Sequence, residues 1–222
     1  MTMMTPNTLV KWLDVDRMPA HGGSGQWPEP GEWREVDGDL APCVNGLHVC
    51  TLAQSMNWLT AECWLVEIDG DRIEEPDKLV VRRARLTERV EAWNDRTARL
   101  FAADCAEHVL PLYEQQYPGD DRPRRCIAAT RGYANGSVTR ATWDAAWAAA
   151  EAAARAAAQA VAWAAARAVA WAAEDAAWAA AEAAARAAAQ TAAWAAALAG
   201  AGAAERAWQT ERLLAYLGGE VG

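Results

Sequence analysis

Alternating apolar and polar positions predict short strands in the first 90 residues. Residues 8–13 (TLVKWL) predict a short strand. Residues 62–69 (ECWLVEID), which end at Gly70, and residues 77–86 (DKLVVRRARL) predict two further strands. Between the first strand and these two, residues 19–38 are rich in glycine, proline and acidic side chains, so they predict a long loop.

The segment between this loop and the second strand contains two further signals. Asn45-Gly46 separates two short apolar pieces, and this dipeptide is a strong signal for a hairpin turn. Leu52, Met56 and Leu59 then recur at helical spacing, and Thr51 is a suitable N-cap residue. The first 90 residues therefore predict a small sheet with one helix.

From residue 94 onward the apolar positions follow the helical period of 3.6 residues. Residues 94–116 carry a broad apolar band that predicts one amphipathic helix. The sequence PGDD interrupts it, and Pro123 is placed near the first turn of a second helix. Asn135-Gly136 predicts the end of that helix.

Residues 137–199 contain neither glycine nor proline and carry an internal repeat. The sequence that starts at Asp144 returns at Asp175, an offset of 31 residues. An offset of this size is about 8.6 helical turns, so successive copies in one helix would face nearly opposite sides. Helical hairpins return the tryptophans to equivalent places, which favours hairpins over the alternative of one long helix or coiled pair.

These patterns predict an α+β N-terminal domain followed by an all-α array of helical hairpins rich in alanine and tryptophan, mostly α overall. We place the first domain at residues 1–90 and the second at residues 91–222, with repeat copies at 144–174 and 175–205. Alanine has the highest helix propensity, and each tryptophan buries a large apolar area between alanine-lined faces.

The net charge of −9 is concentrated in the first 90 residues, which carry nine basic and fifteen acidic side chains. Direct nucleic-acid binding is therefore not expected, because phosphate neutralisation requires a basic surface. An acidic surface suits a basic protein partner, and we predict that Glu29, Glu32, Trp33 and Glu35 contact it.

Several features predict a cytoplasmic protein that does not span a membrane. The first residues lack the pattern of a signal peptide, and charged residues interrupt the alanine-rich stretch. Five cysteines without a regular framework suit a reducing compartment.

One cluster has the residue types of a chemical site. Cys43, His48 and Cys50 combine thiols with an imidazole, which are the ligands of zinc and the partners in thiol catalysis. Their spacing matches no standard zinc module, so we favour two small thiols and a strand histidine without metal. We predict no cofactor and no catalytic residue.

Beyond these patterns, the chain resembles bacterial and phage proteins known as putative immunity proteins. The residues that carry the resemblance are the segment RLFAADCAEH…DRPRRCIAATRGYANG at 99–136, the Ala/Trp-rich helices, and WQTERLLAYL at 208–217. Upstream, residues 31–59 resemble a small uncharacterised domain with a C-x-x-G-x-H-x-C core, here Cys43, Gly46, His48 and Cys50. The resemblance implies a protein that binds and neutralises another protein.

Our leading functional hypothesis is therefore a non-catalytic, toxin-neutralising or defence-modulating binder whose partner is a toxin or defence component. Three alternatives stay open. One is a phage-encoded inhibitor of a host defence enzyme, and another is an enzyme centred on His48 with Cys43 or Cys50. The third is a structural protein that forms homo-oligomers through its helices.

Overall fold

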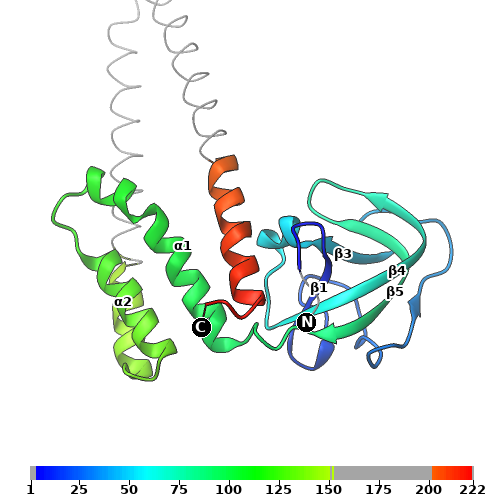
Figure 1. Cartoon of the computed structure of the whole chain (residues 1–222), viewed down its shortest axis with the longest axis horizontal. Helices are drawn as coiled ribbons and strands as arrows, with labels where there is room; N and C mark the ends of the chain where they lie inside the picture. Colours follow the sequence, from blue (N-terminus) through cyan, green and yellow to red (C-terminus); the bar gives the residue numbers. More distant parts are fainter. Residues whose placement is uncertain (1–3, 151, 153–201, 222) are drawn as a thin grey trace, which may run out of the picture. The chain divides into compact units, whose positions relative to one another are not determined.

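The computed structural model describes residues 4–150, 152 and 202–221. The described residues form two units (Figure 1). Residues up to Ala102 and from Arg206 onward form the first, and residues from Ala103 to Glu205 form the second. Most of the predicted repeat at 144–205, and the choice between hairpins and one long helix at 137–199, lie outside the described residues.

The first unit is built on a five-stranded antiparallel sheet, with strand order β2-β5-β3-β1-β4 and a further pairing between β5 and β4. Because β1 pairs with both β3 and β4, and β5 pairs with both as well, these four strands close into a small barrel and β2 adds to β5. The strands are β1 (Leu9–Leu13), β2 (Arg34–Glu35), β3 (Leu47–Thr51), β4 (Glu62–Glu74) and β5 (Leu79–Arg89).

The predicted fold class is wrong, because the chain is not a mostly α protein dominated by helical hairpins. The antiparallel sheet organises the first unit, and the helical segment after Arg206 belongs to that unit. The two short strands predicted at 62–69 and 77–86 are parts of one long hairpin of β4 and β5. The second half of β4 (DGDRIE) is polar and largely exposed, so it is extended through its pairing with β5 and not through an apolar pattern.

The predicted helix at 51–59 is a shorter 3₁₀-helix, η2 (Leu52–Asn57). Its start is fixed locally, because the Thr51 backbone N–H donates to Gln54 Oε1 over 3.0 Å. A second 3₁₀-helix, η1 (Val15–Arg17), follows β1 and contains the left-handed residue Asp16. Neither is long enough to cover the sheet as an α-helix would.

The turn at Asn45-Gly46 exists but does not join two strands. Ala41 and Asn45 form an isolated bridge, and β3 begins at Leu47 and pairs with β1 and β5. Gly46 has φ +141°, and a Cβ placed on it would lie 2.3 Å from Val80 Cγ1. Glycine is thus required here by both the backbone conformation and the buried neighbour.

Gly46→Ala is expected to lower the free energy of unfolding by about 2–4 kcal/mol, because overpacking against Val80 adds to backbone strain. Gly31→Ala is the matched control, since Gly31 has φ +94° but nothing within 4 Å of a new Cβ. It should lose about 1 kcal/mol from strain alone. Equal losses in urea unfolding of the two variants would contradict the close contact at Gly46.

A chain of aromatic side chains connects the barrel to two helical segments of the same unit. Trp12 of β1 contacts Trp93 at a ring-centroid distance of 5.2 Å, Trp93 contacts Phe101 at 5.9 Å, and Phe101 contacts Tyr216 at 6.0 Å. Edge-to-face pairs of this kind add to the stabilisation from area burial. The helical residues 206–217 thereby bury Tyr216 in the first unit, although they are far in sequence from the strands of that unit.

The predicted helices after residue 94 are confirmed as α1 (Asp95–Gln116) and α2 (Arg122–Ala134). In the second unit they are tied together by Arg131, whose Nη1 lies 2.6 Å from the buried Asp104 carboxylate. The Asp120 carboxylate accepts from the Arg122 backbone N–H over 3.1 Å and so fixes the start of α2. Across the described ranges, no helix combines the length and apolarity needed to cross a membrane.

Candidate functional site

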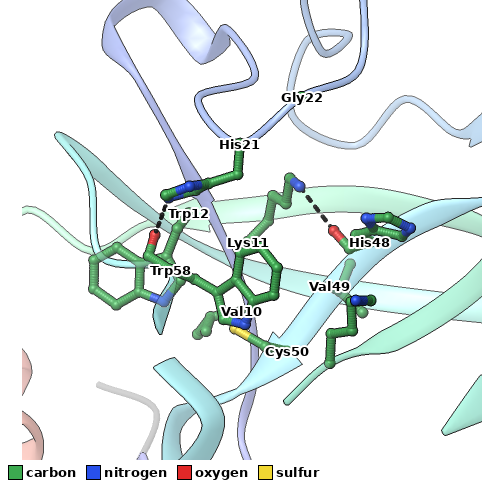
Figure 2. Close-up of a pocket in the computed structure, with 10 residues that line it drawn as sticks. Val10, Lys11, Trp12, His21, Gly22, His48, Val49, Cys50 and Trp58 are labelled. Carbon is green, nitrogen blue, oxygen red and sulfur yellow. Dashed lines mark hydrogen bonds between the residues drawn. The ribbon is translucent and has the colours of Figure 1, made fainter. Parts of the chain in front are cut away.

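A pocket opens on the barrel beside β1 and β3, below the loop that carries His21 and Gly22 (Figure 2). Its narrower part encloses about 40 Å³, and the wider hollow that continues from it encloses about 370 Å³. Both parts share the side chains of Lys11, His21, His48, Trp58 and Lys78. The wider hollow falls in the range of small-molecule sites, and the narrower part is a small extension of it.

Lys11 lies on the core-facing side of its strand. By strand alternation it shares this side with Leu9 and Leu13, both of which belong to the apolar core cluster. Its ammonium group donates to the His48 carbonyl oxygen over 2.8 Å and lies 5.5 Å from the centre of the Trp27 ring. Burial disfavours the charged form and lowers the Lys11 pKa to about 8.

Lys78 and His48 complete the floor of the pocket. Lys78 Nζ lies 5.5 Å from the centre of the Trp58 ring, and the ring is held by its own N–H, which donates to the Asp77 carbonyl oxygen over 2.7 Å. Burial, followed by the nearby Lys11 and Lys78 ammonium groups, lowers the His48 pKa. His48 is therefore neutral at pH 7 and offers one ring N–H and one ring acceptor.

The glycine-rich loop above the pocket is held at two points. The His21 ring packs edge-on against Trp58 at 5.3 Å, and its Nε2 lies 3.2 Å from the Trp58 carbonyl oxygen, so this nitrogen is the donor (Figure 2). At the other end, the Arg34 guanidinium donates to the Ser24 and Gly25 carbonyl oxygens over 2.7 and 3.1 Å. These contacts hold the loop over the pocket.

The charge of the pocket is opposite to that of the protein. The chain has nineteen arginines and only two lysines, and both lysines line this pocket. Arg34 and two of the three histidines join them, whereas no aspartate or glutamate is among the lining residues. The nearest carboxylate to Lys78 is that of Asp77, with N···O 3.7 Å. Although the net charge of the chain is −9, both of its lysines therefore lie at this pocket.

The predicted Cys43, His48 and Cys50 cluster is placed around this pocket but is not assembled as a metal or catalytic site. Cys43 is exposed, and its Sγ lies 3.8 Å from Lys78 Nζ. Cys50 is buried beside Ser55 Oγ at 3.8 Å, and burial raises its pKa to about 11, so it carries a thiol and no thiolate at pH 7. Within residues 4–150, 152 and 202–221, no group of three or more His, Cys, Asp or Glu side chains has the arrangement of a metal site.

The predicted partner-binding residues lie at and before β2, the edge strand of the sheet, and we call them the β2 edge patch: Glu29, Glu32, Trp33 and Glu35. Glu29 forms an ion pair with Arg17, and Glu35 lies 3.6 Å from Arg83. The Trp33 ring contacts two guanidinium groups of β5, those of Arg83 at 4.4 Å and Arg85 at 4.7 Å. The patch is therefore a mixed surface of acids, arginines and one aromatic ring.

Of the residues that line the pocket, only Cys43, His48 and Cys50 were predicted as site candidates from the sequence. Lys11 reads as an ordinary polar position of a strand, and Trp27 and Trp58 read as parts of a loop and a helix. One signal was available, because lysine occurs at only two positions in a chain rich in arginine. That rarity marks Lys11 and Lys78 but cannot show that β1 and the start of β5 bring them together.

By its fold and site, this is an α+β protein with a cationic, tryptophan-walled pocket on a small antiparallel barrel. The family model described as Imm-5 like putative immunity protein matches residues 88–216. The match covers more than half of the chain, so the chain belongs to this family, as the motifs at 99–136 and 208–217 predicted. It begins after the barrel strands β1 to β4, so the pocket lies outside it. No curated protein and no solved structure matches the chain.

Proposed function

We propose that this protein is a non-catalytic binder that neutralises a protein toxin. The observation that carries the proposal is membership of the Imm-5 like putative immunity protein family over residues 88–216. An immunity protein acts by occupying its partner, so its requirement is a surface that the partner recognises and no reaction centre of its own. The buried, protonated Cys50 agrees with this proposal, because it offers no activated nucleophile.

The β2 edge patch is the surface that we assign to the partner. It combines an exposed acid, Glu32, with the indole ring of Trp33, and aromatic and arginine side chains are enriched where proteins bind tightly. The ion pairs of Glu29 and Glu35 hold these side chains in place before binding. Such an edge suits a partner with a basic surface.

A pull-down with the tagged full chain from native lysate, followed by mass spectrometry, identifies the partner. The captured protein should be toxic when expressed alone in a bacterial host and harmless when expressed with this chain. A captured protein whose toxicity is unaffected by co-expression would overturn the neutralising role.

Charge reversal of the β2 edge patch should weaken this complex. In Glu29→Lys/Glu32→Lys/Glu35→Lys the association rate at low salt is expected to fall by about tenfold or more, because steering of a basic partner is lost. The matched control reverses three exposed acids elsewhere, Glu88, Glu211 and Glu220, with the same change in net charge. Equal effects of the two triple variants in surface plasmon resonance would show that net charge, and not the patch, attracts the partner.

A further inference from the structure

Lys11 is half-buried, and among the described residues no carboxylate pairs with its ammonium group. Buried lysines in proteins are normally paired with a carboxylate or extend their ammonium group into water. In the part of the chain described by the structure, Lys11 Nζ instead donates to the His48 carbonyl and lies 5.5 Å from the centre of the Trp27 ring, and the Arg34 guanidinium adds a like charge nearby. Lys78, Arg34 and two histidines line the same hollow and add no negative charge. The side chains that line the pocket are therefore cationic or neutral, and such a lining suits an anionic ligand.

The aromatic side chains that line the pocket indicate the shape of a suitable ligand in addition to its charge. The Trp58 ring lies beside Lys78, and the Trp27 ring lies beside Lys11 and Arg34, each at 5.5 Å from the cationic atom. Flat, partly apolar walls next to cations suit a ligand that has an anionic group on a flat body. The Arg34 guanidinium already donates to loop carbonyls, and Lys78 also lies 3.7 Å from the Asp77 carboxylate. Lys11 is therefore the principal point charge for an anion, with Lys78 as the second.

From this arrangement we propose that the pocket binds a small organic anion, a carboxylate or phosphate monoester on a flat apolar body, with the anionic group held by Lys11 and Lys78 and the body against Trp58. His48 supplies a neutral ring N–H or acceptor beside it, and the loop with His21 covers it (Figure 2). The wider hollow, of about 370 Å³ and lined by both lysines and Trp58, admits a ligand of this size. The site lies in the barrel and does not depend on the proposed toxin binding.

The test uses the rarity of lysine. In full-length protein with ¹³C-labelled lysine side chains, the two lysines of the chain give two Cε signals, and both report on the pocket. The probes are two matched pairs, benzoate with benzamide and adenosine monophosphate with adenosine, together with inorganic phosphate alone. Comparing benzoate with adenosine monophosphate distinguishes a carboxylate from a phosphate ligand.

We expect at least one anion to shift both lysine signals saturably, with its neutral counterpart about tenfold weaker or more, because the ammonium groups recognise the charge. Benzamide or adenosine binding as tightly as its anion would overturn the proposal and leave an apolar cavity. Lysine signals that do not move with any probe at millimolar concentration would overturn it as well. Inorganic phosphate alone should bind more weakly than adenosine monophosphate, since it lacks the flat body.

Lys78→Met should weaken the best anion by about tenfold or more and leave its neutral counterpart unchanged. Arg72→Met is the matched control, because it removes one exposed positive charge of β4 that does not line the pocket. Equal losses in the two variants, measured by calorimetry on protein with unchanged circular dichroism, would show a general charge effect and contradict the assigned site. Trp58→Leu tests the aromatic contact separately from the charges. It should lower the affinity for benzoate or adenosine monophosphate more than the affinity for inorganic phosphate.

Discussion

Replacing Tyr216 by alanine is expected to lower the free energy of unfolding of the barrel unit by about 3–5 kcal/mol, the range for large aromatic truncations in a core. Tyr216 is 2 % exposed, and its ring contacts Phe101 at a centroid distance of 6.0 Å. Phe101 in turn contacts Trp93, which contacts Trp12 of β1. The loss should therefore appear in β1, although β1 lies more than 200 residues away in the chain.

Hydrogen exchange read by mass spectrometry is the measurement, because it reports on β1 and β4 separately from the helices of the second unit. Tyr117→Ala is the control, since Tyr117 is only half-buried and contacts Tyr113 in the second unit. It should lose about 1 kcal/mol and leave β1 exchange unchanged. If Tyr216→Ala leaves β1 protection at its wild-type level, the C-terminal helical residues do not support the barrel.

Lys11→Met is expected to stabilise the protein at pH 7 by about 1–3 kcal/mol, because methionine fills a similar volume without a buried charge. The size of the expected stabilisation follows from the Lys11 pKa, which burial lowers from 10.5 to about 8. A shift of this size corresponds to about 3 kcal/mol, from which about 1 kcal/mol is lost with the hydrogen bond to the His48 carbonyl. A charge retained at this cost is consistent with a role in binding.

The stability difference between Lys11→Met and wild type is expected to depend on pH in a defined direction. Between pH 8 and 10.5 the unfolded chain holds a proton on Lys11 that the folded chain has released, so wild-type stability gains from this group as pH rises. The advantage of Lys11→Met should therefore be full below pH 8 and vanish near pH 10.5. Groups that do not interact with Lys11 cancel in the difference between the two proteins. His48 does not cancel, because the Lys11 ammonium lowers its pKa, so the comparison is made from pH 7 upward, where His48 is neutral in both proteins.

Urea unfolding at several pH values measures this difference, with Arg72→Met as the exposed-charge control. Arg72 forms a surface ion pair with Glu74 at 3.1 Å, so its loss should change stability by less than about 1 kcal/mol at every pH. A Lys11→Met variant that is less stable than wild type at pH 7 would show that the ammonium group supports the fold, and would contradict its reading as a binding group.

The sequence predicted elements well wherever local signals agreed. β1 was predicted from a short apolar run, α1 from its regular apolar period, and α2 because Pro123 and Asn135 mark its ends. The predictions failed where pairing overrode local pattern. The polar second half of β4 is a strand only because β5 lies beside it, and the Leu52, Met56 and Leu59 spacing formed a 3₁₀-helix of six residues.

The site shows the same division. From the sequence we predicted Cys43, His48 and Cys50 as a cluster, because they lie in one short segment. In the structure they line a pocket whose basic side chains come from four separate segments. Lys11 lies on β1, His21 and Arg34 flank the glycine-rich loop, and Lys78 precedes β5. No local pattern relates these positions.

By itself the sequence determined the family, the helices of residues 95–134, the acidic charge and the rarity of lysine, because each depends on residue identity or on a short period. Only the tertiary structure decided that the strands close into a barrel, that Tyr216 packs into the same unit as Trp12, and that both lysines face one pocket. These last features depend on contacts between segments distant in the chain, whose register follows from the packing of the whole unit.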